Sequence, residues 1–79
     1  MTTATSTPTL SDAVTVAADT RLQALDTRVA IFLGADAPAE GDAGLIIGPG
    51  ETIDIPAGDF RHRTVGAKPG RISYRPWEA

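Results

Sequence analysis

Hydrophobic and polar residues alternate over short stretches of this chain, most clearly in its second half. Residues 51–55 and 71–75 each carry two large, mainly apolar side chains two positions apart, with polar residues between them. An alternation of period two predicts β-strands that bury one face. Residues 45–47, Leu-Ile-Ile, are apolar throughout and predict a short buried strand. Weaker forms of the same signal predict further strands at residues 21–25, 28–33 and 60–65.

Residues 11–18 allow two interpretations. Two valines lie at strand spacing with Thr15 between them, which favours a strand. A helix is the alternative, because Ser11 is a common capping residue and the apolar residues 14, 18, 22 and 25 lie at roughly helical spacing. The strand is the preferred reading.

Turn signals separate these segments. Residues 48–51 (Gly-Pro-Gly-Glu) and 68–71 (Lys-Pro-Gly-Arg) both place Pro second and Gly third, as a type II turn requires. Tight turns between consecutive strands predict antiparallel pairing of sequence neighbours. Residues 34–44 are small or acidic, and they are predicted to form one long loop. The whole pattern predicts an all-β fold, a small antiparallel β-sandwich or barrel of about six to seven short strands.

The N-terminus differs from the rest of the chain. Residues 1–10 are rich in Thr and contain few apolar side chains, which predicts an extended, flexible arm that orders against a partner. Residues 11–79 are predicted to form a single β domain. The N-terminus lacks the features of a signal peptide, and no stretch approaches the roughly 20 apolar residues of a membrane span.

Composition makes a partner protein the expected supplement to a small core. At 79 residues, burial and conformational entropy nearly cancel. The chain has no cysteine, which excludes disulfides and thiolate metal sites. We therefore expect association with another chain, and a homo-oligomer, with a trimer as the working guess.

Charge is divided unevenly along the chain. Residues 1–59 carry a formal charge of −7 and residues 60–79 carry +4, for a net charge of −3. If the last two strands form a hairpin, one face of it holds four arginines, namely Arg61, Arg63, Arg71 and Arg75. Such a face suits an acidic protein surface better than nucleic acid, because stacking aromatic residues are scarce and the net charge is negative. Plain solvated arginines remain the alternative.

Candidate catalytic groups are few. His62 is the sole histidine, and no neighbouring residue in the sequence presents a nucleophile to it. Glu51, Asp54 and Asp59 are better read as solvated side chains than as an acid/base pair. The acidic loop lacks the ligand spacing of an EF-hand, and Gly48-Pro49-Gly50 is not followed by the residues of a phosphate-binding loop. We predict no catalytic, cofactor or metal site.

Two aromatic residues join the arginines as interface candidates. Trp77 lies two residues from the end of the sequence and either closes the core or anchors an interface. Phe32 lies on the second face of a strand whose first face is fully apolar. That strand is either central in a two-layer structure or covered by a neighbouring subunit.

The order of these features resembles a known family. A Thr/Ala/Val-rich N-terminus precedes an apolar strand that ends in Leu33-Gly34 and a loop of small residues. An apolar strand, Pro-Gly-Glu (residues 49–51), an alternating strand and Gly-Arg-Ile-Ser-Tyr (residues 70–74) follow. Over residues 12–77 this resembles the small β-sandwich structural proteins of tailed phages, including capsid decoration (cement) proteins.

That resemblance implies a non-enzymatic virion protein, present in many copies and made in the host cytoplasm. It would bind the major capsid protein or other virion proteins on the capsid surface, through a β core and an N-terminal arm, without binding nucleic acid or a membrane. The alternative is a tail, baseplate or fibre-associated β module that binds surface glycans.

Overall fold

The structure is a computed structural model that describes residues 2–34, 38 and 44–76. This part of the chain holds eight β-strands and no helix, which confirms the all-β prediction. The strands are β1 (Thr2–Ser6), β2 (Val14–Val16), β3 (Thr20–Ala24), β4 (Val29–Leu33), β5 (Leu45–Ile47), β6 (Thr52–Ile55), β7 (Gly58–Thr64) and β8 (Gly70–Pro76). β2 settles the reading of residues 11–18 in favour of a strand. No helix long and apolar enough to cross a membrane occurs among the described residues.

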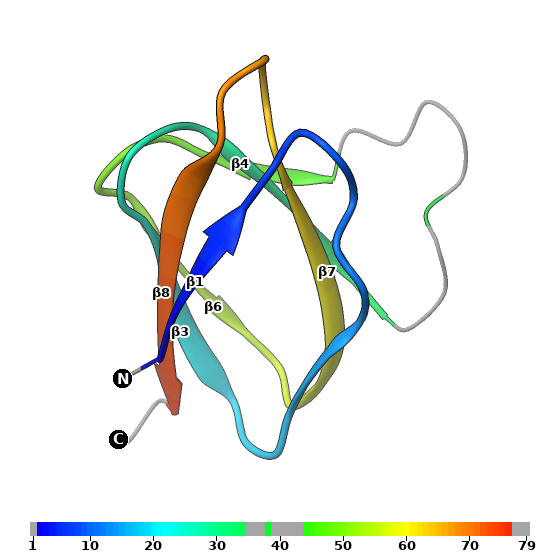
Figure 1. Cartoon of the computed structure of the whole chain (residues 1–79). Helices are drawn as coiled ribbons and strands as arrows, with labels where there is room; N and C mark the ends of the chain where they lie inside the picture. Colours follow the sequence, from blue (N-terminus) through cyan, green and yellow to red (C-terminus); the bar gives the residue numbers. More distant parts are fainter. Residues whose placement is uncertain (1, 35–37, 39–43, 77–79) are drawn as a thin grey trace.

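The strands form two antiparallel sheets that pack together as a small β-sandwich (Figure 1). The first sheet has the order β1-β8-β3-β6, and the second has the order β2-β7-β4-β5. The core between them is apolar, and its largest members are fully buried: Leu22, Ile55 and Ile72 from the first sheet, and Val29, Ile31 and Phe60 from the second. The two layers therefore bury the faces that the alternation of residues predicts.

Connections between the strands differ from the prediction. Only β4 and β5 pair with a neighbour in sequence, and every other connection between consecutive strands passes from one sheet to the other. The expectation that sequence neighbours pair, including β7 with β8, is therefore wrong. Alternation fixes which side chains face the core, but it does not identify the partner strand. A turn that arches over the core satisfies the alternation as well as a hairpin does.

The N-terminal segment belongs to the sandwich in this structure. The sequence predicts an arm over residues 1–10, whereas β1 pairs with β8 along its whole length, from Thr2 opposite Tyr74 to Ser6 opposite Gly70. The chain then crosses to the second sheet, where the Ser11 amide donates to the carbonyl of His62 at 2.9 Å. The sequence does not reveal this strand, because β1 is an edge strand of mostly exposed side chains and therefore lacks apolar residues at alternate positions. Ser6 is its only fully buried residue.

The two Pro-Gly segments adopt different conformations. In the first, the Glu51 amide donates to the Gly48 carbonyl at 3.0 Å and Gly50 has φ 83°, which confirms the type II turn. The second prediction is wrong, because Gly70 has no positive φ and begins β8. Gly70 is needed for space instead: a Cβ there would lie 2.5 Å from Cγ2 of Thr27. β8 thus passes directly against the corner between β3 and β4.

We expect Gly70→Ala to destabilise the fold by about 1–3 kcal/mol, because the added methyl group overpacks this contact. The measurement is the free energy of unfolding from urea denaturation. Thr27→Ser keeps the hydroxyl group but removes Cγ2, so Gly70→Ala should cost clearly less in a Thr27→Ser background. Equal costs in the two backgrounds would show that the methyl group of Thr27 is not the obstacle.

Candidate functional site

The four arginines do not share a face. Arg61 and Arg63 lie on β7 in the second sheet, whereas Arg71 and Arg75 lie on β8 in the first sheet. Neighbouring core residues on each strand point inward, so the arginines point outward on opposite sides of the sandwich. The predicted basic face is wrong because it depended on a β7–β8 hairpin that does not form.

Three of these arginines contact groups within the chain. Arg71 holds Asp26 through two bonds, from Nε to Oδ2 at 2.8 Å and from Nη2 to Oδ1 at 3.0 Å. The hydrogen bonds from Arg71 hold the pKa of Asp26 below its usual value. Arg61 donates to the carbonyl of Ser11 at 3.2 Å, and the guanidinium of Arg63 lies 5.6 Å from the ring centre of Phe32. These contacts tie loops and strands together, whereas no ion pair joins the exposed Arg75 to another described residue.

The aromatic candidates offer little surface. Phe32 lies on the central strand β4 and is 5% exposed, under Arg63 and against Gly44. Phe32 thus fits the reading of a central strand in a two-layer structure. Trp77 lies outside the described residues, as do Asp36, Glu40 and Asp42 of the acidic loop. Within the described part of the chain, no three His, Asp or Glu side chains gather where they could hold a metal ion.

His62 meets a hydroxyl group that the sequence did not place beside it. Its Nδ1 lies 2.8 Å from Oγ of Ser6, across the sandwich from β7 to β1, and both residues are buried. Burial holds the pKa of His62 below its usual value, which favours the neutral ring. Ser6 is 0% exposed, so this pair has no path to a substrate and fastens β1 to the second sheet.

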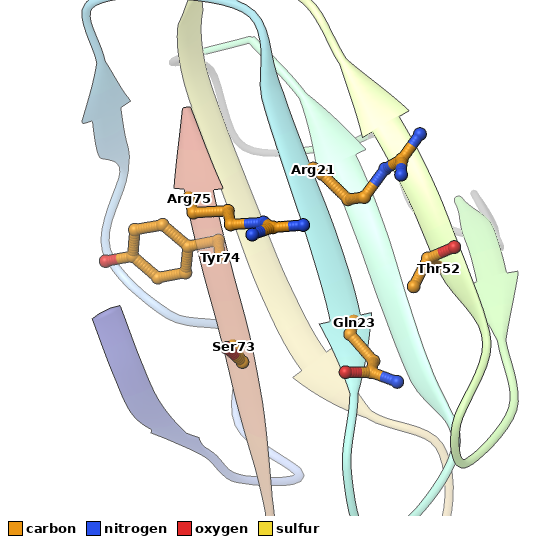
Figure 2. A pocket seen from close by; sticks show the side chains of 6 residues that line it. All are labelled: Arg21, Gln23, Thr52, Ser73, Tyr74 and Arg75. Carbon is orange, nitrogen blue, oxygen red and sulfur yellow. The ribbon is translucent and has the colours of Figure 1, made fainter. Parts of the chain in front are cut away.

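A polar groove crosses the outer face of the first sheet (Figure 2). Its volume is about 280 Å³, and its lining consists of Arg21, Gln23, Thr52, Ser73, Tyr74 and Arg75. The strand register explains five of these residues, because it sets the outward side chains of β8, β3 and β6 in rows. The sixth, Tyr74, lines the groove from β8 although its ring packs against Phe60. We call these six residues the polar groove.

Two rows of side chains cross the polar groove from strand to strand. In the first row, Arg75 is opposite Arg21, which is opposite Asp54. Arg21 binds Asp54, with Nε 2.9 Å from Oδ1, and this bond holds the pKa of Asp54 below its usual value. In the second row, Ser73 is opposite Gln23, which is opposite Thr52. The groove therefore combines hydrogen-bonding groups with an excess of positive charge at the Arg75 end.

An apolar surface lies at the β5 edge of the second sheet. Leu33, Leu45 and Ile46 are 50%, 51% and 52% exposed. Leu45 is opposite Ile31, so Leu33 is its diagonal neighbour on the same face, while Ile46 points to the other face. We call these three residues the apolar edge. The sequence predicts a buried strand here, and that prediction is wrong for Leu45 and Ile46 because β5 lies at the end of its sheet.

The other three sheet edges are protected in ways that β5 is not. β1 carries exposed threonines, β6 carries Asp54 within an ion pair, and β2 carries Thr15 bonded to Asp59. Charged or polar side chains on edge strands discourage pairing with other chains. β5 has neither, so in the described part of the chain it is the edge best suited to contact a partner.

Comparison with protein-family models, with curated proteins and with solved structures found no match for this chain.

Proposed function

We propose that this chain is a non-enzymatic virion structural protein of a tailed phage, a capsid decoration (cement) protein that binds the head shell and stabilises it. The observation that carries the proposal is the apolar edge formed by Leu33, Leu45 and Ile46. Its partner is the major capsid protein, and the resemblance to decoration proteins in the order of strands and turns adds support.

The apolar edge suits a permanent contact. Three half-exposed aliphatic side chains beside unpaired strand backbone allow a partner to add a strand and bury apolar area at the same time. A domain of 79 residues gains stability from such burial, because its own core is small. A shell protein that remains in place for the life of a particle fits this combination.

Aromatic placement favours a decoration protein over a glycan-binding tail module. Flat binding of sugars uses exposed aromatic rings, and apart from the fully buried Phe60 the aromatic residues of this chain are Phe32, Tyr74 and Trp77, the last of which lies outside the described residues. Phe32 is buried, and Tyr74 is half-buried with its ring edge-on to Phe60 at 5.8 Å. These two rings are therefore used in packing.

The test is binding of purified protein to head shells that lack it, measured by co-sedimentation. Ile46→Lys puts a charge in the centre of the contact while leaving the core untouched, since Ile46 is half-exposed. We expect it to weaken binding by about tenfold or more, because the contact loses apolar burial and must desolvate an ammonium group.

Ala67→Lys is the matched control, since it adds the same charge at an exposed turn residue. It should bind like the unmodified protein. Unchanged binding of Ile46→Lys would remove the apolar edge as the contact. Failure of the unmodified protein to bind shells would overturn the decoration proposal itself.

A further inference from the structure

We propose that the polar groove binds a carboxylate-bearing, extended segment of a partner protein, with Arg75 as the residue that holds the carboxylate. This inference goes beyond the virion proposal, because it depends only on the outer face of the first sheet. That face points away from the second sheet, which carries the apolar edge.

The first row holds two arginines and one aspartate, so it has one more positive charge than negative charge. Two like charges opposite each other on neighbouring strands destabilise a sheet unless a counter-charge lies nearby. Asp54 supplies that charge to Arg21 through the ion pair at 2.9 Å. No ion pair joins Arg75 to any described residue. Counting the described residues alone, the groove thus has one uncompensated positive charge, which matches one carboxylate better than a dianionic phosphate group.

The second row supplies neutral hydrogen-bonding groups next to that charge. Ser73 and Thr52 carry hydroxyl groups that both donate and accept. Gln23 donates from Nε2 to the carbonyl of Gly50 at 3.2 Å, which fixes the orientation of its amide. When a carboxylate of the bound segment contacts Arg75, the neighbouring main chain of that segment therefore lies beside these three residues and can form hydrogen bonds with them.

The shape of the groove fits an extended chain. It spans three strands on an open sheet face, and Figure 2 shows the guanidinium of Arg75 reaching toward β3 while the ring of Tyr74 points to the other side of β8. Because that ring packs against Phe60, it offers no platform for stacking a sugar or a base. Charge and shape together favour an acidic peptide.

The experiment is an NMR titration of the ¹⁵N-labelled full chain with a hexaglutamate peptide. Shifts should concentrate on β3, β6 and β8. Arg75→Gln should weaken binding by about tenfold, because a charge-assisted bond to the carboxylate is lost. Arg28→Gln removes the same charge from an exposed residue outside the groove and should leave affinity within about twofold. Thr52→Val should weaken binding by a smaller factor, about two- to fivefold.

Three outcomes would overturn the proposal. Equal losses in Arg75→Gln and Arg28→Gln would mean nonspecific attraction, and shifts centred on the second sheet would place the ligand elsewhere. Tighter binding of a heparin hexasaccharide than of hexaglutamate, removed by Arg75→Gln, would assign the groove to sulfated glycans instead. Because Arg75 and Thr52 are exposed, both variants should keep the wild-type spectrum away from the groove.

Discussion

Phe60→Ala is expected to cost about 3–5 kcal/mol of folding free energy, the largest effect of any single substitution considered. Phe60 is 0% exposed, lies opposite Val14 and Leu33 in its sheet, and meets Tyr74 of the other sheet edge-on at 85°. Truncation removes contacts on both layers and leaves a cavity that neither sheet can close alone. A chain of this length has roughly 4–12 kcal/mol of total stability. The variant should therefore lose a large share of that stability and unfold at a clearly lower urea concentration than the unmodified protein.

Urea denaturation monitored by circular dichroism measures this loss. The matched control is Leu33→Ala, which removes an aliphatic side chain from the strand position opposite Phe60 but at 50% exposure. It should cost about 1 kcal/mol, since much of its area is already in water. Similar losses in the two variants would contradict the placement of Phe60 at the centre of the core.

Acid should destabilise the protein through His62 between about pH 7 and pH 5. Burial lowers the pKa of His62 in the folded state below the value of about 6.5 that it has when unfolded. At a pH between the two pKa values, His62 is protonated in the unfolded state but remains neutral in the folded state. The stability from the neutral ring is complete above the unfolded pKa, and it falls as the pH drops toward the folded pKa.

His62→Asn isolates this effect, because asparagine places a neutral hydrogen-bonding atom near the position of Nδ1 without titrating. Its free energy of unfolding should change little from about pH 7 to about pH 5, whereas the unmodified protein loses stability. Arg71 and Arg21 hold the pKa values of Asp26 and Asp54 below normal, so these two carboxylates become protonated, and their ion pairs are lost, only at a lower pH than the one at which His62 titrates. Parallel pH profiles for the two proteins would show that His62 is not the titrating group.

Fold class could be predicted from this sequence, whereas topology could not. The alternation in residues 51–55 and 71–75 identifies inward residues such as Ile55 and Ile72, and both are buried. The same alternation is compatible with a hairpin or with an arch over the core. The prediction therefore paired β8 with β7, whereas β8 pairs with β1 and β3. β1 escaped detection because an edge strand with one fully buried residue leaves little hydrophobic signal in the sequence.

The candidate surfaces depend on that topology, so sequence reasoning found them only in part. Arg75 was selected as an interface residue, but its groove is completed by Arg21 and Gln23 from β3, whose pairing with β8 no local pattern reveals. The apolar edge was also missed. An uninterrupted Leu-Ile-Ile run is typical of a buried strand, and only the position of β5 at the end of its sheet exposes Leu45 and Ile46.

The most direct test of the proposed decoration role is cryo-electron microscopy of tailed-phage particles assembled with and without this chain. We expect a small two-layer β density in many symmetry-related copies on the outside of the head, with the apolar edge of β5 against the major capsid protein. A head surface without such density, or a sandwich bound only to the tail, would contradict the decoration proposal.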